Sequence, residues 1–301
     1  MSETRSGFVA VVGRPNVGKS TLVNALVGTK VSITSSRPQT TRSKIRGVMT
    51  RTADGAPTAQ AVLVDTPGLH KPRTALGERL NSMVHGTLAE SDLVVFVVDA
   101  NAPVGPGDRR VAERAGLSGS PVVCVVNKVD AAGRDDIMER LGEAAAWDFD
   151  AYVPVSARTG DGVSIVADEI VDRLPAGPLY FPPDSTSDQA EMVVVGEIIR
   201  EKFLERLRDE LPHSLVVVVQ EMDQRDSGTL FIDARAIVER DSQKGIIIGK
   251  GGELLRTAGS EARLELERLY GTNVYLDLRV AVEKDWQQRP SMLDRFGFSS
   301  H

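Results

Sequence analysis

The sequence predicts an α/β domain with a mostly parallel sheet, followed by a smaller α+β domain. From residue 7 to about residue 174, short apolar runs alternate with helical patterns, as in parallel sheets covered by helices on both faces. A proline-rich stretch without periodicity follows at residues 175–187, and after it the order of elements becomes α-β-β-α-α-β. We therefore expect domains at residues 1–174 and 188–301, with a linker at 175–187 between them.

Five apolar runs of the first domain are predicted to be buried strands, because each ends in polar or glycine-containing residues and most lead into a helical pattern. They read "GFVAVVG", "QAVLVDTPG", "SDLVVFVVDA", "SPVVCVVNKVD" and "DAYVPVSA". The run "SKIRGVMTRT" should add an antiparallel edge strand, since only the short turn "ADGAPT" separates it from the next strand. Ligands of such sheets bind at the carboxyl ends of the strands, where the polar motifs of this chain lie.

The second domain is predicted to begin with the long helix "SDQAEMVVVGEIIREKFLERL", capped by Ser187 or Asp188. Two alternating strands follow, "SLVVVVQEM" and "GTLFIDARAIVER", and then two helices around the glycine turn "GKGG". The strand "NVYLDLRVAV" closes the domain. One face of the second of these two helices should be apolar throughout. That face comprises Leu254, Leu255, Ala258, Ala262, Leu266 and Leu269.

Composition limits the class of protein. The 301 residues carry a net charge of −6, so any contact with a polyanion must be local. The single cysteine, Cys124, lies in an apolar run and cannot form an internal disulfide, which fits a reducing compartment. Because the N-terminus lacks an apolar signal core and no run of about eighteen apolar residues occurs, we expect a cytoplasmic protein. A peripheral contact with the inner face of the cell membrane stays open.

The first chemical motif is "GRPNVGKS", residues 13–20, which has the spacing of a phosphate-binding loop between a strand and a helix. Its glycines let backbone N–H groups turn toward anionic oxygens, and the helix start adds a positive dipole end. Lys19 should reach the terminal phosphates, and the Ser20 hydroxyl should ligate Mg²⁺. The expected nucleotide contacts here are Gly13, Arg14, Pro15, Asn16, Val17, Gly18, Lys19, Ser20 and Thr21.

The second motif, "DTPG", ends the third strand. The carboxylate of Asp65 can hold Mg²⁺, and the Gly68 N–H can meet a γ-phosphate and so sense its presence. Residues 30–43 form the first switch, the segment in which a threonine closes over Mg²⁺, and we favour Thr41 over Thr40. Predicted nucleotide contacts are Asp65, Thr66, Pro67, Gly68 and Leu69; predicted Mg²⁺ ligands are Ser20, Thr41 and Asp65; predicted catalytic residues are Lys19, Thr41 and Gly68.

The third motif, "NKVD", selects the base. Guanine presents donors at N1 and N2 beside the acceptor O6, and the carboxylate of Asp130 can accept from both donors. Asn127 should tie this loop to the phosphate loop, and the stem of Lys128 should cover the purine face. In "SA" after the last strand, Ala157 can offer its N–H to O6. The predicted guanine contacts are Asn127, Lys128, Val129, Asp130, Ser156 and Ala157, which makes the nucleotide GTP.

Together, "GRPNVGKST", "PQTTR", "DTPGLH", "NKVD" and "SARTG" resemble the Era family of bacterial GTPases. The later "IIIGKGG" resembles the GxxG loop of the type II KH domain which that family carries. The resemblance covers nearly the whole chain. It implies a Ras-like P-loop GTPase domain followed by a KH domain, with GTP, GDP and Mg²⁺ as ligands. It also implies binding to the 3′ end of small-subunit ribosomal RNA during assembly of the pre-30S ribosomal particle.

Two residues bear on hydrolysis. Leu69 stands where Ras-like proteins place a water-orienting glutamine, and an aliphatic side chain cannot orient water, so intrinsic hydrolysis should be slow. Era-like relatives share this replacement. Asn16 resembles an asparagine that holds potassium beside the phosphates in related GTPases; a purely structural role in the loop is the alternative.

The glycine turn should let a nucleic-acid backbone approach closely, with the apolar "III" run forming a groove for single-stranded bases. The predicted RNA contacts are Lys244, Ile248, Gly249, Lys250, Gly251, Gly252 and Arg256. We expect a monomer. The alternative function is a GTP-dependent membrane or cell-division regulator that acts through protein partners. Trp286 and the aromatic residues at 296–298 could serve such a contact, or could instead cap a C-terminal core.

Overall fold

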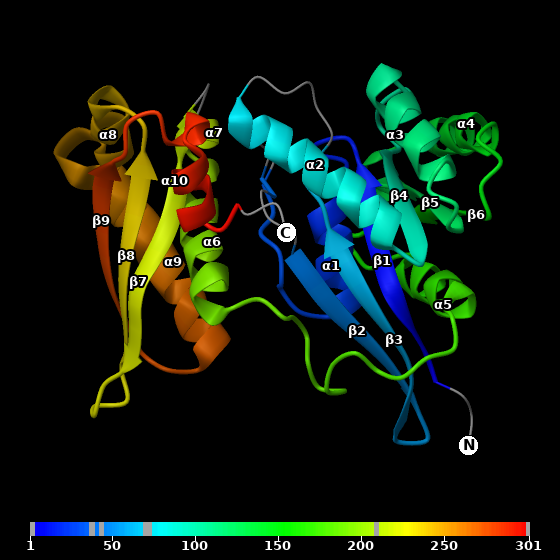
Figure 1. Cartoon of the computed structure of the whole chain (residues 1–301), viewed down its shortest axis with the longest axis horizontal. Helices are drawn as coiled ribbons and strands as arrows, with labels where there is room; N and C mark the ends of the chain where they lie inside the picture. The colour runs from blue at the N-terminus through cyan, green and yellow to red at the C-terminus, as the bar shows by residue number, and fades with distance from the viewer. Residues whose placement is uncertain (1–3, 36–39, 42–44, 69–73, 208–210, 299–301) are drawn as a thin grey trace.

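The computed structural model describes residues 4–35, 40–41, 45–68, 74–207 and 211–298, and it contains two sheets (Figure 1). The first sheet comprises β1 (Arg5–Gly13), β2 (Ile45–Ala53), β3 (Ala56–Asp65), β4 (Leu93–Asp99), β5 (Val122–Asn127) and β6 (Ala151–Val155). The helices around it are α1 (Lys19–Val27), α2 (Ala75–Glu90), α3 (Pro106–Gly116), α4 (Arg134–Ala145) and α5 (Val163–Arg173), with the short 3-10 turn η1 (Val129–Ala131).

The strand order of this sheet is β2-β3-β1-β4-β5-β6, and all neighbours are parallel except the antiparallel pair β2 and β3. Successive residues of a strand point to opposite faces. In β1, Val9 and Val11 pack on the face covered by α1 and α5, whereas Ala10 and Val12 pack on the face covered by α2, α3 and α4 (Figure 1). The predicted mostly parallel sheet with an antiparallel edge strand is confirmed.

The second sheet has the order β7-β8-β9, with β7 and β8 antiparallel and β8 and β9 parallel. Its strands are β7 (Val216–Gln224), β8 (Leu230–Val238) and β9 (Val274–Val282). Its helical segments are α6 (Glu191–Leu204), α7 (Leu211–Ser214), α8 (Asp241–Ile248), the turn η2 (Lys250–Gly252), α9 (Glu253–Tyr270), η3 (Trp286–Gln288) and α10 (Pro290–Arg295). Helices α6, α8 and α9 cover one face and bury a second apolar core. The order of elements from α6 to β9 is the predicted one, with the single turn α7 added.

A third apolar cluster joins the two domains through α2. Leu76, Leu80 and Met83 of α2 pack with Trp286 and Leu293 from the C-terminal segment. In Figure 1, α10 accordingly lies beside the first turns of α2. Because the side chain of Trp286 is fully buried, it caps this cluster and offers no surface to a membrane. Phe298 is 5% exposed and stacks on the same ring.

The segment between the domains is bonded along the first sheet. Gln60 in β3 is fully buried, and its side chain accepts hydrogen bonds from the backbone N–H groups of Tyr180 and Phe181 at 2.8 and 2.9 Å. It also donates to the Phe181 carbonyl at 3.0 Å. Further along, the Val48 N–H of β2 donates to the Thr186 carbonyl at 2.8 Å. The linker therefore follows the edge of the sheet, and few residues remain between its last contact and α6.

Two details of the sequence prediction are wrong. Helix α6 begins at Glu191 with Ala190 as its N-cap, because the expected cap Ser187 uses its hydroxyl to donate to the Arg46 carbonyl at 2.8 Å. Asp188 pairs instead with the Arg46 guanidinium at 2.7 Å. On α9 the apolar face ends early, since Leu269 is 44% exposed. Among the described residues, no helix has the length and hydrophobicity needed to cross a bilayer.

The structure predicts an unreactive thiol. Cys124 on β5 is fully buried, and burial raises its pKa to about 12. At pH 8 its thiolate fraction should be roughly a thousandfold below that of an ordinary cysteine. We expect no reaction with a thiol-specific chromogenic reagent in the folded protein and one equivalent per chain in denaturant. Stoichiometric labelling of the native chain within minutes would contradict this packing.

Candidate functional site

The phosphate loop lies between β1 and α1. Helix α1 begins at Lys19, and the residue before it, Gly18, has φ 97°, in the left-handed region that favours glycine. A Cβ on Gly18 would overlap the amide nitrogen of Asn127, so a side chain at this position would push the base-binding loop away. Asn16 also has a positive φ, of 65°. These turns expose backbone N–H groups at the helix start, where anions are stabilised.

Lys19 is 6% exposed, and its ammonium lies inside the loop. It donates to the carbonyls of Gly13 at 3.2 Å and Arg14 at 2.9 Å. Burial lowers the pKa of Lys19 to about 8, and the charge of Asp65 offsets part of that effect. A polyanion at this loop would favour the charged form of Lys19. A charged ammonium here suits the predicted role of Lys19, which is to bind the terminal phosphates.

Asp65 at the end of β3 collects hydroxyls from three segments. Its Oδ2 accepts from Ser20 at 2.7 Å, from Ser32 at 2.7 Å and from Thr41 at 3.2 Å. The hydroxyls of Ser20 and Thr41 are themselves 3.0 Å apart. All three predicted Mg²⁺ ligands therefore meet at one point. Thr40, the second choice, instead directs its carbonyl to Arg200.

These side chains fit a magnesium ion. The residue Asp65 is fully buried, and its second oxygen, Oδ1, has no hydrogen-bond partner among the described residues. Burial raises the pKa of Asp65, and the hydroxyls of Ser32 and Ser20 oppose that rise. A buried carboxylate oxygen without a donor is costly, and a hard cation or its water would satisfy it. Oxygen-only donors are also the set that Mg²⁺ prefers.

The "DTPG" segment packs directly on the phosphate loop. Thr66 is fully buried and donates to the Val11 carbonyl at 2.8 Å, which fixes the loop to β1. A Cβ on Gly68 would lie 2.7 Å from the backbone nitrogen of Pro15, so only glycine fits this approach. Leu69 lies outside the described residues. A cavity joins this segment to the phosphate loop and the first switch; its lining residues are Pro15, Asn16, Gly18, Lys19, Ser20, Thr21, Thr34, Ser35, Thr40, Thr41 and Gly68.

The predicted base-binding loop is tied to the phosphate loop by two side chains. Asn127 donates to the Val17 carbonyl at 2.8 Å, and Lys128 donates to the Asn16 carbonyl at 2.6 Å. Lys128 has φ 70° and also pairs with Asp99 at 2.6 Å. The Ala157 N–H, which we expect at guanine O6, donates here to Asn127 Oδ1 at 3.0 Å. An incoming O6 would have to share or replace that bond.

Asp130 is held by two neighbours. Ser156 donates to its Oδ1 at 2.6 Å, and the Arg158 Nε donates to its Oδ2 at 2.9 Å. These two contacts hold the pKa of Asp130 below its usual value, the Ser156 hydrogen bond having the larger effect. The carboxylate is therefore ionised and oriented to accept donors. This contact of Arg158 was not predicted from the sequence, although Arg158 directly follows the "SA" pair.

The glycine turn of the second domain joins α8 to α9 through η2. Gly249 and Gly252 have φ 76° and 77°, and a Cβ on Gly249 would lie 2.9 Å from the Leu254 Cβ. Arg256 returns one turn later and donates to the Gly251 carbonyl at 3.1 Å. The turn therefore needs its glycines for backbone conformation and for its contact with α9. Lys250 stands exposed within it.

Beside this turn runs an open groove of about 400 Å³ between α9 and β9. Its lining residues are Gly252, Leu255, Arg256, Gly259, Ser260, Arg263, Leu276 and Leu278. Of the "III" run, Ile247 is buried in the core and Ile246 is 53% exposed, and its expected contact with RNA bases stays a prediction. The apolar wall of this groove comes from Leu255, Leu276 and Leu278. For Leu276 and Leu278, the signal in the sequence was the alternation of apolar residues along β9.

Comparison with known proteins decides the family. Residues 8–128 match a family model described as a 50S ribosome-binding GTPase, and residues 210–287 match one described as a KH domain. The GTPase Era of Mycobacterium avium is 52% identical over 99% of this chain and its own full length. The chain belongs to the Era family of GTPases. The Mycobacterium tuberculosis Era protein is 49% identical, with the same shares covered.

Two crystal structures of Era proteins agree with the fold. An Aquifex aeolicus Era variant bound to GDP.AlF4⁻ gives a TM-score of 0.92 at 36% identity, covering 98% of this chain and all of that one. Era in complex with MgGDPNP and nucleotides 1506–1542 of 16S ribosomal RNA gives 0.90 at 35% identity, covering 98% and 99%. The expected two-domain Era fold is therefore confirmed. The role of each predicted residue stays a prediction.

Base selection can be tested at Asp130. Asp130→Asn keeps the size of the side chain but turns one acceptor into a donor that faces guanine's own donors. We expect GTP affinity to fall by roughly 100-fold or more, because a charge-assisted bidentate contact is lost. Xanthosine triphosphate, with an oxygen in place of the N2 amine, should recover binding. Titration of a fluorescent nucleotide measures both, with the exposed Asp135→Asn as control. Unchanged GTP affinity in Asp130→Asn would remove the assignment.

Proposed function

We propose that this chain is a GTP-binding, slowly GTP-hydrolysing switch that binds the 3′ end of small-subunit ribosomal RNA and assists assembly of the small ribosomal subunit. The observation that carries the proposal is the full-length match to an Era protein whose structure contains both MgGDPNP and a 16S fragment. The GTPase half alone would not specify this RNA. The glycine turn and its groove supply the second requirement, a surface that a nucleic-acid backbone can approach.

In the first domain, separate groups of residues would bind the phosphates, the guanine base and Mg²⁺. The phosphate-loop amides and Lys19 would bind the phosphates, and Asp130 would select guanine. Ser20, Thr41 and Asp65 would hold Mg²⁺, which when bound neutralises charge on the phosphate oxygens. Gly68 would report the γ-phosphate through its N–H. Since Leu69 brings no polar group to orient water, intrinsic hydrolysis is expected to be slow.

We further propose domain boundaries at 1–174 and 188–301, a monomeric chain and the pre-30S particle as its place of action. The linker at 175–187 supports the boundary, because none of its residues belongs to the apolar cores of the two domains. Tyr180 contacts the ring of Phe8 at 4.9 Å between centroids.

Potassium is a finer proposal for the same site. Asn16 lines the nucleotide cavity, and a monovalent cation beside the phosphates would add positive charge there. We expect GTP turnover to be severalfold faster in potassium chloride than in sodium chloride at equal ionic strength. Asn16→Ala should remove the difference while retaining GDP binding. Phosphate release under both salts measures it, and identical turnover in the two salts would leave Asn16 with a structural role.

The two ligands of the chain should affect each other. We expect RNA affinity to differ between a non-hydrolysable GTP analogue and GDP by about five- to 150-fold, the usual range of allosteric coupling. Because linkage is reciprocal, RNA should tighten the binding of the GTP analogue by the same factor. The measurement is fluorescence anisotropy of a labelled 3′-end RNA at fixed salt, since phosphate contacts are salt-dependent.

The predicted RNA-binding surface can be tested with a double variant of the glycine turn and a control on α9. The double variant Gly249→Asp and Gly252→Asp places two carboxylates against a phosphate backbone and should remove RNA binding in both nucleotide states. Arg268→Ala, exposed near the far end of α9, should bind RNA like the parent.

The coupling between the two ligands has its own contradicting outcome. If the RNA affinities measured with the GTP analogue and with GDP agree within about twofold, well below the coupling range, the switch does not act through RNA. A protein or membrane partner would then be the better assignment.

A further inference from the structure

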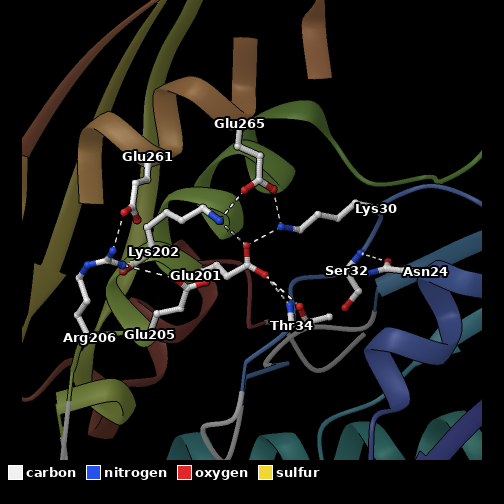
Figure 2. Close-up of polar contacts among 10 residues, drawn as sticks. All are labelled: Asn24, Lys30, Ser32, Thr34, Glu201, Lys202, Glu205, Arg206, Glu261 and Glu265. Carbon is white, nitrogen blue, oxygen red and sulfur yellow. Dashed lines mark hydrogen bonds and ion pairs between the residues drawn. The ribbon is translucent and has the colours of Figure 1, made fainter. Parts of the chain in front are cut away.

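A charged cluster connects the second domain to the first switch of the GTPase domain (Figure 2). It is centred on Glu201 of α6, which is 2% exposed although it carries a carboxylate. Lys30 of the first domain donates to Glu201 and to Glu265 of α9, each at 2.5 Å. Lys202 pairs with the same two carboxylates, at 3.1 and 2.5 Å. Two lysines and two glutamates thus neutralise one another across the domain boundary.

The carboxylate of Glu201 also binds the backbone of the switch. Its Oε1 accepts from the Thr34 N–H at 2.8 Å, and the Thr34 hydroxyl lies 3.4 Å away. Two residues earlier, Ser32 donates to Asp65 at 2.7 Å, and its backbone is held by Asn24 of α1. The segment 32–34 is therefore fixed on one side to Asp65, a predicted metal ligand, and on the other to Glu201 of α6. Figure 2 shows the contacts with Glu201 and Asn24.

The far end of the switch repeats this arrangement. Arg200, the neighbour of Glu201 on α6, is fully buried and donates through Nη2 to the Thr40 carbonyl. Glu197 holds the guanidinium in place at 2.6 and 2.8 Å. The next residue after Thr40 is Thr41, whose hydroxyl donates to Asp65 at 3.2 Å. A single peptide unit thus separates a contact with the second domain from a predicted metal ligand.

We propose that Arg200 and Glu201 are positioning residues for the GTPase site, acting as a clamp from the second domain that holds both described ends of the first switch closed over the metal site. The inference rests on the proposed function. It assigns a role in nucleotide binding to a helix outside the GTPase domain. Among the described residues, neither side chain lines the cavity at the phosphate loop, and each acts through the switch backbone.

The buried charges of the clamp make it favour the closed state of the first switch. The Arg200 guanidinium and the Glu201 carboxylate are buried, so each is stable only while its partners are in place. Burial alone would raise the pKa of Glu265, yet the hydrogen bonds from Lys202 and Lys30 hold it below its usual value. Opening the switch would strip Arg200 of the Thr40 carbonyl and Glu201 of the Thr34 N–H. The second domain therefore favours the closed switch, which is the state that Thr41 and a γ-phosphate also favour.

The test compares nucleotides in full-length protein. Arg200→Ala should weaken a fluorescent non-hydrolysable GTP analogue about tenfold or more, because a hydrogen bond to a charged group is lost. GDP affinity should change less than about twofold, since GDP lacks the group that closes the switch. The Mg²⁺ concentration that half-saturates GTP-analogue binding should rise in parallel. Arg200→Lys keeps the charge and one donor, so it should recover part of the loss.

A second pair of variants guards against misfolding at a buried arginine. Glu201→Ala removes the acceptor of the Thr34 N–H, whereas Glu201→Gln keeps one, so Gln should fall between Ala and the parent. Lys30→Ala, at a side chain 32% exposed, should act in the same direction with a smaller effect. Matched controls are Arg206→Ala and Glu261→Gln, a pair 2.6 Å apart on the same helical layer (Figure 2). Neither side chain bonds to the described residues of the switch.

The outcomes separate the two claims. A selective loss of GTP-analogue affinity in the Arg200 and Glu201 variants, absent from the controls, supports the clamp. Equal loss for GTP analogue and GDP, with a lowered melting temperature, shows a structural role and overturns it. Parental affinities in all clamp variants also overturn it while leaving the GTPase assignment intact. Failure of the parent chain itself to bind GTP would instead overturn the proposed function.

Discussion

One buried carboxylate sets the arrangement of the nucleotide site. Asp65 ends β3 next to β1, so its side chain reaches the phosphate loop, and its Oδ2 gathers hydroxyls from Ser20, Ser32 and Thr41. The Ser20 hydroxyl belongs to the start of α1. Those of Ser32 and Thr41 belong to the described ends of the first switch, which lie outside helices and strands. A buried anion requires several donors, which gives three separate segments a common meeting point. The position of the first switch thus depends on where β3 ends.

Much of this site follows from local sequence. The spacing of "GRPNVGKS", "DTPG" and "NKVD" predicts the loops because strand ends and glycines are local features, and parallel strands bring their carboxyl ends to one edge. The near-continuous apolar runs of β1 and β5 likewise indicate two covered faces. The only signal in the sequence for the role of Arg158 was its position directly after the "SA" pair. Ser32 carries no signal beyond being a hydroxyl in the switch.

What the sequence does not reveal are contacts between distant segments. Arg200 reaches Thr40 across 160 positions, and Gln60 binds the linker across 120 or more. A buried glutamine in a strand or an arginine on an amphipathic helix has no pattern that names its partner. The failed cap at Ser187 has the same origin, because its hydroxyl is used by the Arg46 carbonyl of β2 rather than by its own helix. Tertiary hydrogen bonds override the local preference.

The path of the linker explains why α6 can reach the switch at all. Gln60 and Val48 hold residues 180–186 against the sheet, and the Arg46–Asp188 pair extends this attachment almost to the start of α6 at Glu191. The segment between these contacts and α6 is short, so it restricts the position of the helix. On its other side the second domain meets α2 through the apolar cluster around Trp286, and α2 begins a few residues after the segment predicted to sense the γ-phosphate. The second domain is therefore in contact with the first switch through charged groups, and with α2 through apolar packing. A change at Thr34 or Thr40 in the first switch would break or remake contacts with the domain that carries the glycine turn, which gives the two sites a direct connection.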